Sequence, residues 1–416
     1  MKIKLKPYIE IIYGNKNSIL YDLSKEKIYL LNKSAAQIMA LLKEWHTKDS
    51  IITAFKKFFA HHSDSIESDV IDVLNFCKTI GILTNNEDDN FKLDFLRNIE
   101  QYPLKRVWCE LTNNCNLKCF HCYAEAGEKN TQDLDIKNIY SFLAGISKKG
   151  CKELQLTGGE PFLRKDIWEI VSYIKTLNID SIEIFTNLTL VTKNDIKLMK
   201  EYGVKIATTF LGPNEEIHDL LTQKKGSFTH LISTAELIQE QEIQLQAAII
   251  VVRQNEKHVA QIKKFLSKRQ IKYRTPDDVR PVGRGKNENI CPLNCESKRT
   301  TPDFKLNRST FYYAQQFNSC WGHLLMMRAD GKIILCPHAR DFVIGDIKQQ
   351  SMDEILNSDL LKKYWTLTVD QIDTCRDCEY RYFCEDCRPL AFYENTGLYS
   401  KMPRCTYNPY KGMWNQ

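Results

Sequence analysis

The sequence predicts an α/β protein in which repeated strand–helix units are flanked by a small α+β unit before them and a cysteine-rich segment after them. Three observations support this. Strand-like and helical patterns alternate from residue 105 to 285, three strand-like runs precede three helical patterns in residues 1–84, and nine of the fifteen cysteines lie beyond residue 286. Repeated βα units form a parallel sheet covered by helices, either an open partial barrel or a doubly wound sheet.

Length and composition exclude several classes of protein. The chain has 416 residues, of which 43% are hydrophobic and 26% are charged, as in globular proteins of two or three domains. Its longest apolar run, residues 247–252, is far too short to cross a bilayer, and the start of the chain lacks the pattern of a secretory signal. The net charge of +6 is mild and spread out. We therefore expect a cytoplasmic protein with no membrane and no nucleic-acid partner.

Residues 1–84 are expected to form a winged-helix-like α+β unit. The runs 9–13, 18–22 and 27–31 have the character of short strands, and turn residues separate them. Helical patterns follow at 34–45, 49–59 and 68–80, the first of them capped by Asn32 or Ser34. Residues 85–104 include a polar, acidic stretch, which predicts a linker.

Residues 105–285 supply the predicted sheet. Segments with helical periodicity separate six strand-like runs, which are expected at 106–111, 153–157, 181–186, 204–210, 246–252 and 271–274. In both fold types compatible with this pattern, reactive groups lie at the C-terminal ends of the strands. Functional residues are therefore expected directly after each strand.

Three cysteines follow the first predicted strand at the spacing C-x3-C-x2-C: Cys115, Cys119 and Cys122. Three thiolates so close in sequence converge on one site only if the backbone forms a loop. Together with His121 they fit a Cys3His zinc site. They also fit a [4Fe–4S] cluster in which one iron stays open for a chelating substrate. In a reducing compartment, cysteines clustered in this way are usually metal ligands or redox groups.

The second predicted strand ends in Gly158, Gly159 and Glu160. Glycines after a strand let the backbone approach a ligand closely, and a carboxylate accepts hydrogen bonds from an ammonium group. Alone, this sequence also fits a tight turn with a surface glutamate. Its position one βα unit after the cysteine loop favours a binding site shared by the two segments.

The cysteine loop and the Gly-Gly-Glu segment together resemble the radical S-adenosylmethionine (AdoMet) enzymes. The resemblance implies a partial (βα)6 barrel, similar to a TIM barrel, whose three loop cysteines hold a [4Fe–4S] cluster. The open iron of that cluster chelates AdoMet. A donor such as flavodoxin or ferredoxin supplies an electron, AdoMet splits into methionine and a 5′-deoxyadenosyl radical, and the radical removes a hydrogen from an unactivated carbon.

The same resemblance implies which other residues contact AdoMet. Its ammonium group is received by the Gly-Gly-Glu segment, its ribose lies near Thr186 and Asn187, and its carboxylate lies near Arg253. Residues 212–219, with 226–228, also resemble a segment that is common in one large branch of these enzymes.

A second group of cysteines lies in the predicted C-terminal domain, residues 286–416: Cys320, Cys336, Cys375, Cys378, Cys384, Cys387 and Cys405. Paired C-x2-C knuckles are typical of zinc ribbons, but seven cysteines exceed one zinc site. The pattern resembles the SPASM extension of radical AdoMet enzymes, which carries two auxiliary [4Fe–4S] clusters.

The resemblance also divides these cysteines between the two auxiliary clusters. Cys320, Cys336 and Cys387 serve the first cluster, and the other four serve the second. The fourth position of the first cluster is filled by Cys291 or Cys295, or it stays open for a substrate thiolate. The sequence does not decide between these.

The N-terminal unit resembles the peptide-recognition domain of maturases that modify ribosomally made peptides. In that domain, a leader peptide adds a strand to the exposed sheet edge beside the last helix, which here means residues 27–31 and 70–77. A DNA-binding winged helix is the alternative, but no recognition helix with a basic face supports it.

The three resemblances predict a maturase that binds a precursor peptide through its leader and installs an oxidative crosslink in the core peptide. A thioether to a cysteine is the first choice, and a carbon–carbon crosslink comes next. Three other classes remain: a sulfatase-maturing type of protein-activating enzyme, a tetrapyrrole-modifying enzyme, in whose branch the sequence Arg-Pro-Val-Gly-Arg-Gly at 280–285 also occurs, and a zinc-binding scaffold. The sequence assigns no general base.

Overall fold

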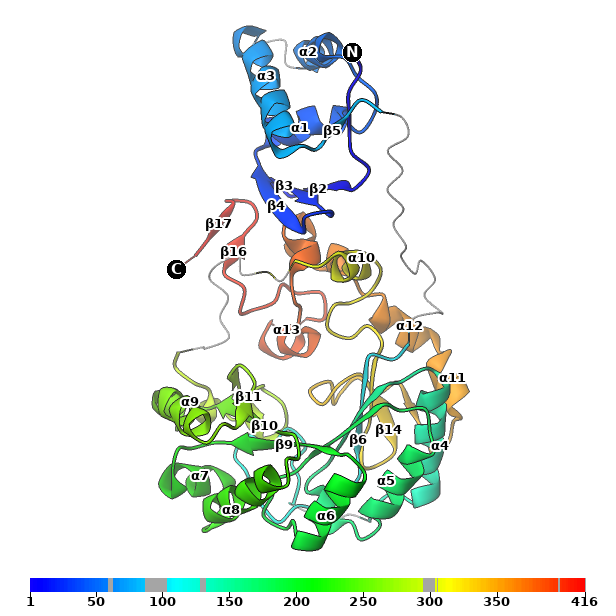
Figure 1. Cartoon of the computed structure of the whole chain (residues 1–416), viewed down its shortest axis with the longest axis vertical. Coiled ribbons are helices and arrows are strands. Elements are labelled where there is room, and N and C mark those ends of the chain that lie inside the picture. Colours follow the sequence, from blue (N-terminus) through cyan, green and yellow to red (C-terminus); the bar gives the residue numbers. More distant parts are fainter. Residues whose placement is uncertain are drawn as a thin grey trace.

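The computed structural model describes residues 1–58, 63–86, 103–127, 132–294, 304, 306–395 and 397–415. They form three units along one long axis: the N-terminal unit at one end, the barrel at the other, and the cysteine-rich segment between them (Figure 1). Most of the predicted linker, residues 87–102, lies outside the described residues. Among the described helices, none is both long enough and apolar enough to span a bilayer.

The N-terminal unit is a three-stranded antiparallel sheet covered by three helices. The strands β2 (Ile9–Tyr13), β3 (Ser18–Asp22) and β4 (Lys27–Leu31) pair in that order and have the predicted bounds. Helices α1 (Lys33–Leu41), α2 (Lys48–Phe58) and α3 (Ser63–Ile80) follow. Asn32 caps α1 by accepting a hydrogen bond from the backbone N–H of Ala35, as predicted. The short strands β1 (Lys4–Leu5) and β5 (Leu83–Thr84) pair and close the unit.

The central unit is a sheet whose parallel strands pair in chain order: β6 (Arg106–Glu110), β7 (Glu153–Thr157), β8 (Ser181–Phe185), β9 (Lys205–Phe210), β10 (Leu245–Val251) and β11 (Lys272–Tyr273). Doubly wound sheets reverse their strand order at a switch point, and this sheet does not. Right-handed crossovers that always step in one direction place their helices on one side. The partial barrel is therefore the correct alternative.

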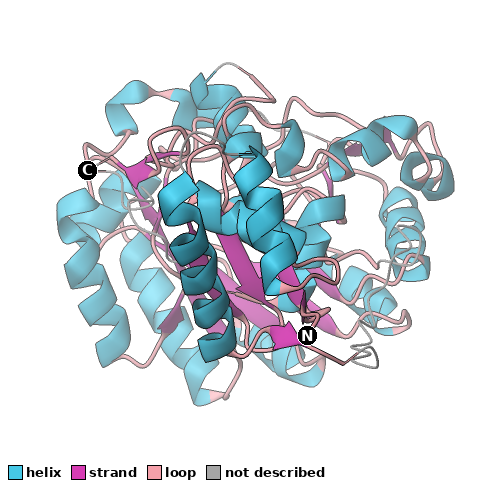
Figure 2. Ribbon diagram, turned by 90° about the horizontal axis from the view of Figure 1, so that it is seen from above, coloured by secondary structure: helices cyan, strands magenta, loops and turns pink. Residues whose placement is uncertain are grey.

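Helices pack around the outside of this sheet, as the view from above shows (Figure 2). They are α4 (Ile136–Lys148), α5 (Ile167–Lys175), α6 (Lys193–Glu201), α8 (Ser227–Glu240) and α9 (Val259–Lys268). Alternate strand residues such as Val107 and Cys109 are fully buried against them. The sequence did not predict α7 (Glu215–Thr222) or the short strand β12 (Asp277–Asp278), which pairs with β10.

The sheet continues beyond the predicted barrel. Strand β13 (Leu324–Met327) pairs parallel with β6, and β14 (Lys332–Ile334) and β15 (Gly345–Asp346) extend it antiparallel. The cysteine-rich segment is thus joined to the barrel by main-chain hydrogen bonds next to the strand that leads into the cysteine loop. Its other elements are short: α10 (Arg308–Gln316), α11 (Met352–Leu356), α12 (Asp359–Trp365), α13 (Arg388–Asn395), β16 (Tyr407–Asn408) and β17 (Met413–Trp414).

Candidate functional site

The cysteine loop, residues 111–127, follows β6 at the C-terminal end of the barrel strands. Backbone N–H groups point at two of its sulfurs: Leu117 donates to Cys115 Sγ at 3.4 Å and Ala126 donates to Cys122 Sγ at 3.5 Å. Such donors stabilise a thiolate. The three predicted ligands therefore lie in one loop with hydrogen-bond donors already directed at their sulfurs.

The three thiols are also close enough to interact electrostatically. Burial raises the pKa of Cys115 to about 11, and Glu160 and Cys122 add to the rise. Burial, Cys122 and Cys115 together raise the pKa of Cys119 well above its usual range. Burial disfavours ionisation of Cys115 and Cys119, and a bound metal would offset this because it takes cysteines as thiolates.

The zinc alternative requires four ligands that converge on one ion. Within the described ranges, no three Cys, His, Asp or Glu side chains are placed to hold a single metal ion. A [4Fe–4S] cube distributes its thiolates over different irons and needs no such convergence. His121 is partly buried, burial lowers its pKa to about 4, and Arg284 and His218 lower it further. The loop therefore fits a cube better than a zinc ion.

A segment from the end of the barrel clamps the cysteine loop. The guanidinium of Arg284 donates to the carbonyl of Cys119 at 2.8 Å and to that of Ala126 at 3.2 Å. The preceding residue, Gly283, has φ +57, and a Cβ there would lie 2.4 Å from the carbonyl oxygen of Tyr123. Only glycine permits this approach. Arg284 was not predicted as a site residue, although it lies in the sequence at 280–285 noted above.

The two predicted glycines let the end of β7 pack against the cysteine loop. A Cβ on Gly158, which has φ +150, would lie 2.4 Å from Thr112 O, and one on Gly159 would lie 2.2 Å from Asn114 O. The backbone N–H of Gly159 donates to Thr112 O at 2.8 Å. The close approach expected from the glycines is therefore made to the loop that carries the cysteines.

Glu160 brings the predicted residues of β7 and β8 together. Its carboxylate is fully buried and accepts hydrogen bonds from Thr186 Oγ1 at 2.7 Å, Asn187 N–H at 2.8 Å and Phe162 N–H at 3.1 Å. Burial raises its pKa to about 7, although these three donors lower it. Three bonds leave one acceptor position on the carboxylate. The side chain of Asn187 in turn donates to Asn116 in the cysteine loop at 2.9 Å.

Arg253 lies apart from these residues. It follows β10, its side chain is exposed, and its guanidinium donates to the backbone carbonyl of Cys291 at 3.0 Å and to that of Glu288 at 3.4 Å. The structure thus brings Gly158, Gly159, Glu160 and the two residues after β8 to the cysteine loop. The side chain of Arg253 instead contacts the segment that leads into the cysteine-rich domain.

Three cysteines predicted for the first auxiliary site interact with one another. The thiol of Cys320 donates to Cys387, and this hydrogen bond lowers the pKa of Cys387. Cys336 raises the pKa of Cys320, so the three sulfurs lie in one charge environment. Arg280 faces Cys387 and Cys320. Cys291 lies beside Glu394, Arg253 and Arg404 instead, and Cys295 lies outside the described residues.

The four cysteines predicted for the second auxiliary site line one small apolar pocket: Cys375, Cys378, Cys384 and Cys405. Burial, followed by Cys384, raises the pKa of Cys375 to about 12. Burial likewise raises the pKa of Cys378, and a bound metal would take these cysteines as thiolates. The division of these cysteines between two clusters stays a prediction.

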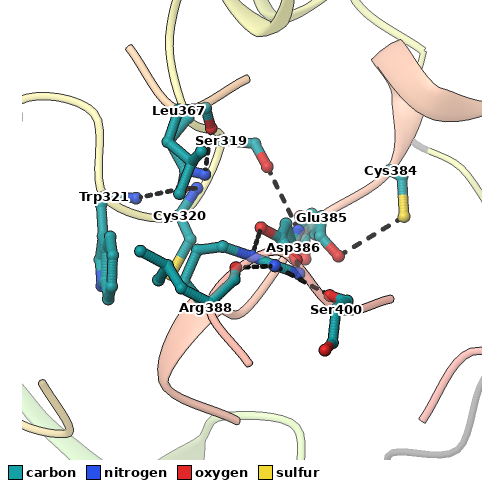
Figure 3. A network of polar contacts seen from close by, with 11 residues as sticks. Ser319, Cys320, Trp321, Leu367, Cys384, Glu385, Asp386, Arg388 and Ser400 are labelled. Atoms are coloured by element: carbon teal, nitrogen blue, oxygen red, sulfur yellow. Dashed lines mark hydrogen bonds and ion pairs between the residues drawn. The ribbon is translucent and has the colours of Figure 1, made fainter. Parts of the chain in front are cut away.

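A buried ion pair lies near cysteines of both auxiliary groups. Arg388 is fully buried, pairs with Asp386, and donates to the carbonyl of Ser400 at 2.9 Å (Figure 3). It also donates to the carbonyl of Leu398 at 2.6 Å. Burial lowers the pKa of Arg388, but Asp386 and then Cys375 and Cys320 raise it above its ordinary value. One cation therefore faces a cysteine of each group. It can offset the negative charge that thiolate-bound clusters bring.

A cavity of about 480 Å³ has residues of the cysteine loop and of the segment after Cys336 on its wall. Tyr123, directly after Cys122, and Arg340, four residues after Cys336, are on its wall. Arg340 pairs with Glu110 at 2.5 Å, and its guanidinium lies 5.8 Å from the Tyr123 ring centre. The other lining residues are polar or small, with carboxylates from Glu125, Asp330 and Asp341 and cations from Lys286 and Arg328. No sequence signal marked this cavity, because it forms between units distant in the chain.

Comparison with known proteins agrees with this site. Residues 109–266 match the Radical SAM superfamily, and residues 320–379 match the iron–sulfur cluster-binding domain SPASM. The chain is 24% identical to the antilisterial bacteriocin subtilosin biosynthesis protein AlbA of Bacillus subtilis over 96% of this chain and 92% of that protein. It is 23% identical to the AdoMet-dependent heme synthase of Methanosarcina barkeri over 74% of this chain and 98% of that protein.

Among solved structures, Streptococcus suis SuiB bound to the precursor peptide SuiA has a similar fold. The TM-score is 0.55 at 16% identity, with 98% of this chain and 100% of that chain covered. The chain therefore contains a radical SAM domain and a SPASM domain. It is a radical SAM enzyme, with AdoMet, a [4Fe–4S] cluster and auxiliary iron–sulfur clusters as cofactors. The fold class and cofactors predicted from the sequence are confirmed.

Proposed function

We propose that this enzyme binds a precursor peptide through its N-terminal unit and installs an oxidative crosslink in the core of that peptide. A thioether to a cysteine sulfur is the first candidate, and a carbon–carbon bond is the second. When bound, the [4Fe–4S] cluster and AdoMet supply a 5′-deoxyadenosyl radical that takes one hydrogen atom from the peptide. Closing the crosslink then releases one proton and one electron, and we assign the electron to the auxiliary clusters.

The exposed edge of the N-terminal sheet is the observation that carries this proposal. Strand β4 pairs only with β3 among the described strands, so its outer edge offers unpaired backbone groups. The ring of Tyr29 on β4 meets Phe76 of α3 at 5.7 Å, edge to face, and Val73 is half-buried on the same helix. An extended peptide added to β4 would find backbone partners on one side and this apolar wall on the other.

The N-terminal unit is attached to the cysteine-rich domain. Tyr21 packs edge to face against Phe311 and Phe383, each with ring centres 5.0 Å apart. Arg381 donates to the carbonyl of Tyr13 at 2.8 Å, and the N–H of Asn15 donates to the carbonyl of Asp377 at 2.8 Å. A leader held on this unit is therefore held at a defined position relative to the auxiliary sites, which favours delivery of the core peptide.

The cavity lined by the cysteine loop and the segment after Cys336 is the proposed place of reaction. Its wall beside Tyr123 borders the radical site, and its wall beside Arg340 borders the first auxiliary group. A peptide segment there would lose its hydrogen atom on one side and its electron on the other. Arg340, Glu110 and Tyr123 form a connected wall that would orient the peptide and exclude water.

Different relatives support different candidate functions. The subtilosin biosynthesis protein and SuiB align with nearly the whole chain, including the N-terminal unit, and both names refer to peptides. The heme synthase aligns with 74% of the chain. A tetrapyrrole substrate is the second candidate, favoured by that likeness and by the shared sequence at 280–285, but it gives the N-terminal edge no role.

The test uses the anaerobically purified full chain and a peptide encoded by a short reading frame next to its gene. We expect the peptide to bind, and to lose two hydrogens per crosslink by mass spectrometry. Phe76→Glu places a charge on the apolar wall and should weaken binding about tenfold or more. Asn75→Glu, exposed on the same helix, is the matched control. Equal affinity of the two variants would contradict the leader site.

A further inference from the structure

The cysteine loop has two solvent-exposed residues, which lie on different faces. Within residues 113–127, Lys118 and Glu125 are exposed. Glu125 lines the cavity assigned to the peptide. Lys118 lies directly before Cys119 and contacts the connection between α7 and α8. The loop can therefore be approached from outside on the Lys118 face while the substrate occupies the cavity.

The connection between α7 and α8, residues 223–226, covers this second face. The N–H of Lys118 donates to Thr222 O at 3.2 Å, that of Phe120 donates to Leu221 O at 3.0 Å, and the side-chain amide of Gln223 donates to Lys118 O. These bonds hold the connection against the backbone on both sides of Cys119. The segment at 212–219 and 226–228, which the sequence marked without a role, flanks these contact residues on both sides.

The connection is fixed from within as well. The carboxylate of Asp219 accepts hydrogen bonds from Gly226 N–H at 2.5 Å, Ser227 Oγ at 2.7 Å and Phe228 N–H at 2.8 Å. Gln223 adopts the left-handed conformation with φ +56, which ends α7. A surface held this firmly can present its side chains in a fixed arrangement.

The side chains presented there are cationic. Lys118, Lys224 and Lys225 are all exposed, and no ion pair among the described residues includes them. Glu215 and Glu216 begin α7, and the carboxylate of Glu215 accepts a hydrogen bond from Thr229 Oγ1. Asp219 is occupied by its three donors. A small positive surface therefore lies over the backbone of Cys119.

We propose that Lys118, Lys224 and Lys225 form the docking surface for an acidic one-electron carrier protein. This inference rests on the radical AdoMet chemistry, because each turnover starts with one electron from outside. The carrier is oxidised by one electron, the cluster held by the loop is reduced by one, and no proton moves. A negatively charged carrier is attracted to this surface, which increases its rate of encounter. The cavity stays free for the peptide.

The experiment measures the binding of an acidic flavodoxin and the cleavage of AdoMet separately. Lys224→Glu/Lys225→Glu should weaken flavodoxin binding about tenfold or more at low ionic strength, and the difference should shrink at about 0.15 M, where charges are screened beyond about 8 Å. Lys264→Glu/Lys268→Glu, an exposed pair on α9, is the matched control and should bind like the wild type. AdoMet cleavage driven by dithionite should be the same in all three proteins.

Three results would overturn the docking surface: equal binding by the two double variants, binding that salt does not affect, or loss of dithionite-driven cleavage in Lys224→Glu/Lys225→Glu. The last would show that the change damages the loop and does not act on the carrier. Failure of the wild type to cleave AdoMet with dithionite would contradict the radical chemistry instead, so the two failures are distinguishable.

Discussion

The carboxylate of Glu160, which follows β7, accepts a 2.8 Å hydrogen bond from the backbone N–H of Asn187, which follows β8. This bond joins the ends of two neighbouring strands beside the cysteine loop. Ionisation of the carboxylate strengthens this bond, yet burial raises the pKa of Glu160 to about 7. Because this pKa exceeds that of an unfolded glutamate, ionisation costs folding stability as the pH rises through about 7. The charged Glu160 carboxylate therefore lowers the folding stability of the protein.

The first prediction concerns AdoMet binding and pH. We expect affinity for AdoMet to fall as the pH drops from 8 to 6, because a protonated Glu160 loses acceptors for Asn187 and for an incoming ammonium group. Glu160→Gln should bind about tenfold or more weakly at pH 8 and show little pH dependence. Anaerobic equilibrium dialysis with labelled AdoMet measures both. A wild-type affinity unchanged between pH 6 and 8 would refute this role.

The second prediction concerns the glycine contact with the cysteine loop. Gly159→Ala would place its Cβ 2.2 Å from Asn114 O and displace the loop. We expect this variant to lose most of its radical-site iron and its AdoMet cleavage, with overpacking that costs about 1–3 kcal/mol. Gly203→Ala has strained backbone, with φ +60, but no atom within 4 Å, so it controls for strain alone. Equal iron content in the two variants would contradict the loop contact.

The third prediction concerns Arg284. Its planar guanidinium reaches the carbonyls of both Cys119 and Ala126, whereas a lysine keeps the charge and cannot bridge them. Arg284→Lys should therefore assemble a cluster that a chelator removes several-fold faster, which the decay of visible absorbance would follow. Arg274→Lys, which alters an ion pair with Glu183 elsewhere in the barrel, is the control. Wild-type decay in Arg284→Lys would show that the clamp is dispensable.

The fourth prediction concerns the attachment of the N-terminal unit. The turn after β2 packs on the second auxiliary loop so closely that a Cβ on Gly14 would lie 2.7 Å from Glu379 Oε2. Gly14→Ala should loosen this attachment, increase the radius of gyration in small-angle scattering and slow peptide modification. AdoMet cleavage without peptide should be unaffected. Gly81→Ala, a change within the same unit with no atom within 4 Å, should leave the radius unchanged. If Gly14→Ala modifies the peptide normally, attachment does not guide delivery.

The elements of the protein follow closely from its sequence. Periodicity and turn residues located the three N-terminal strands and the six barrel strands, because each is a short apolar run bounded by strong turn signals. Asn32 capped its helix for the same local reason. Strand β13 was missed because pairing with β6 is decided by contacts between residues more than two hundred positions apart, which no local pattern contains.

Some residues of the candidate site could likewise be predicted from the sequence, and others could not. Cysteine spacing and the Gly-Gly-Glu segment were visible because their chemistry is local in sequence. Arg284 and Arg340 were not predicted, since their roles depend on backbone carbonyls or a carboxylate brought close by the fold. The predicted roles of the cysteines as cluster ligands remain predictions, as do the AdoMet contacts predicted for Gly158, Gly159, Glu160, Thr186, Asn187 and Arg253.

The central claim is that the cysteine loop supports radical chemistry on a peptide held by the N-terminal unit. The most direct measurement follows 5′-deoxyadenosine and peptide mass together in a reduced, oxygen-free reaction. We predict 5′-deoxyadenosine in at least equal amount to the crosslinks, each crosslink removing two hydrogens, and neither product from Cys115→Ala/Cys119→Ala/Cys122→Ala. A peptide whose mass does not change while 5′-deoxyadenosine forms would contradict the peptide substrate, and crosslinks formed without 5′-deoxyadenosine would contradict the radical.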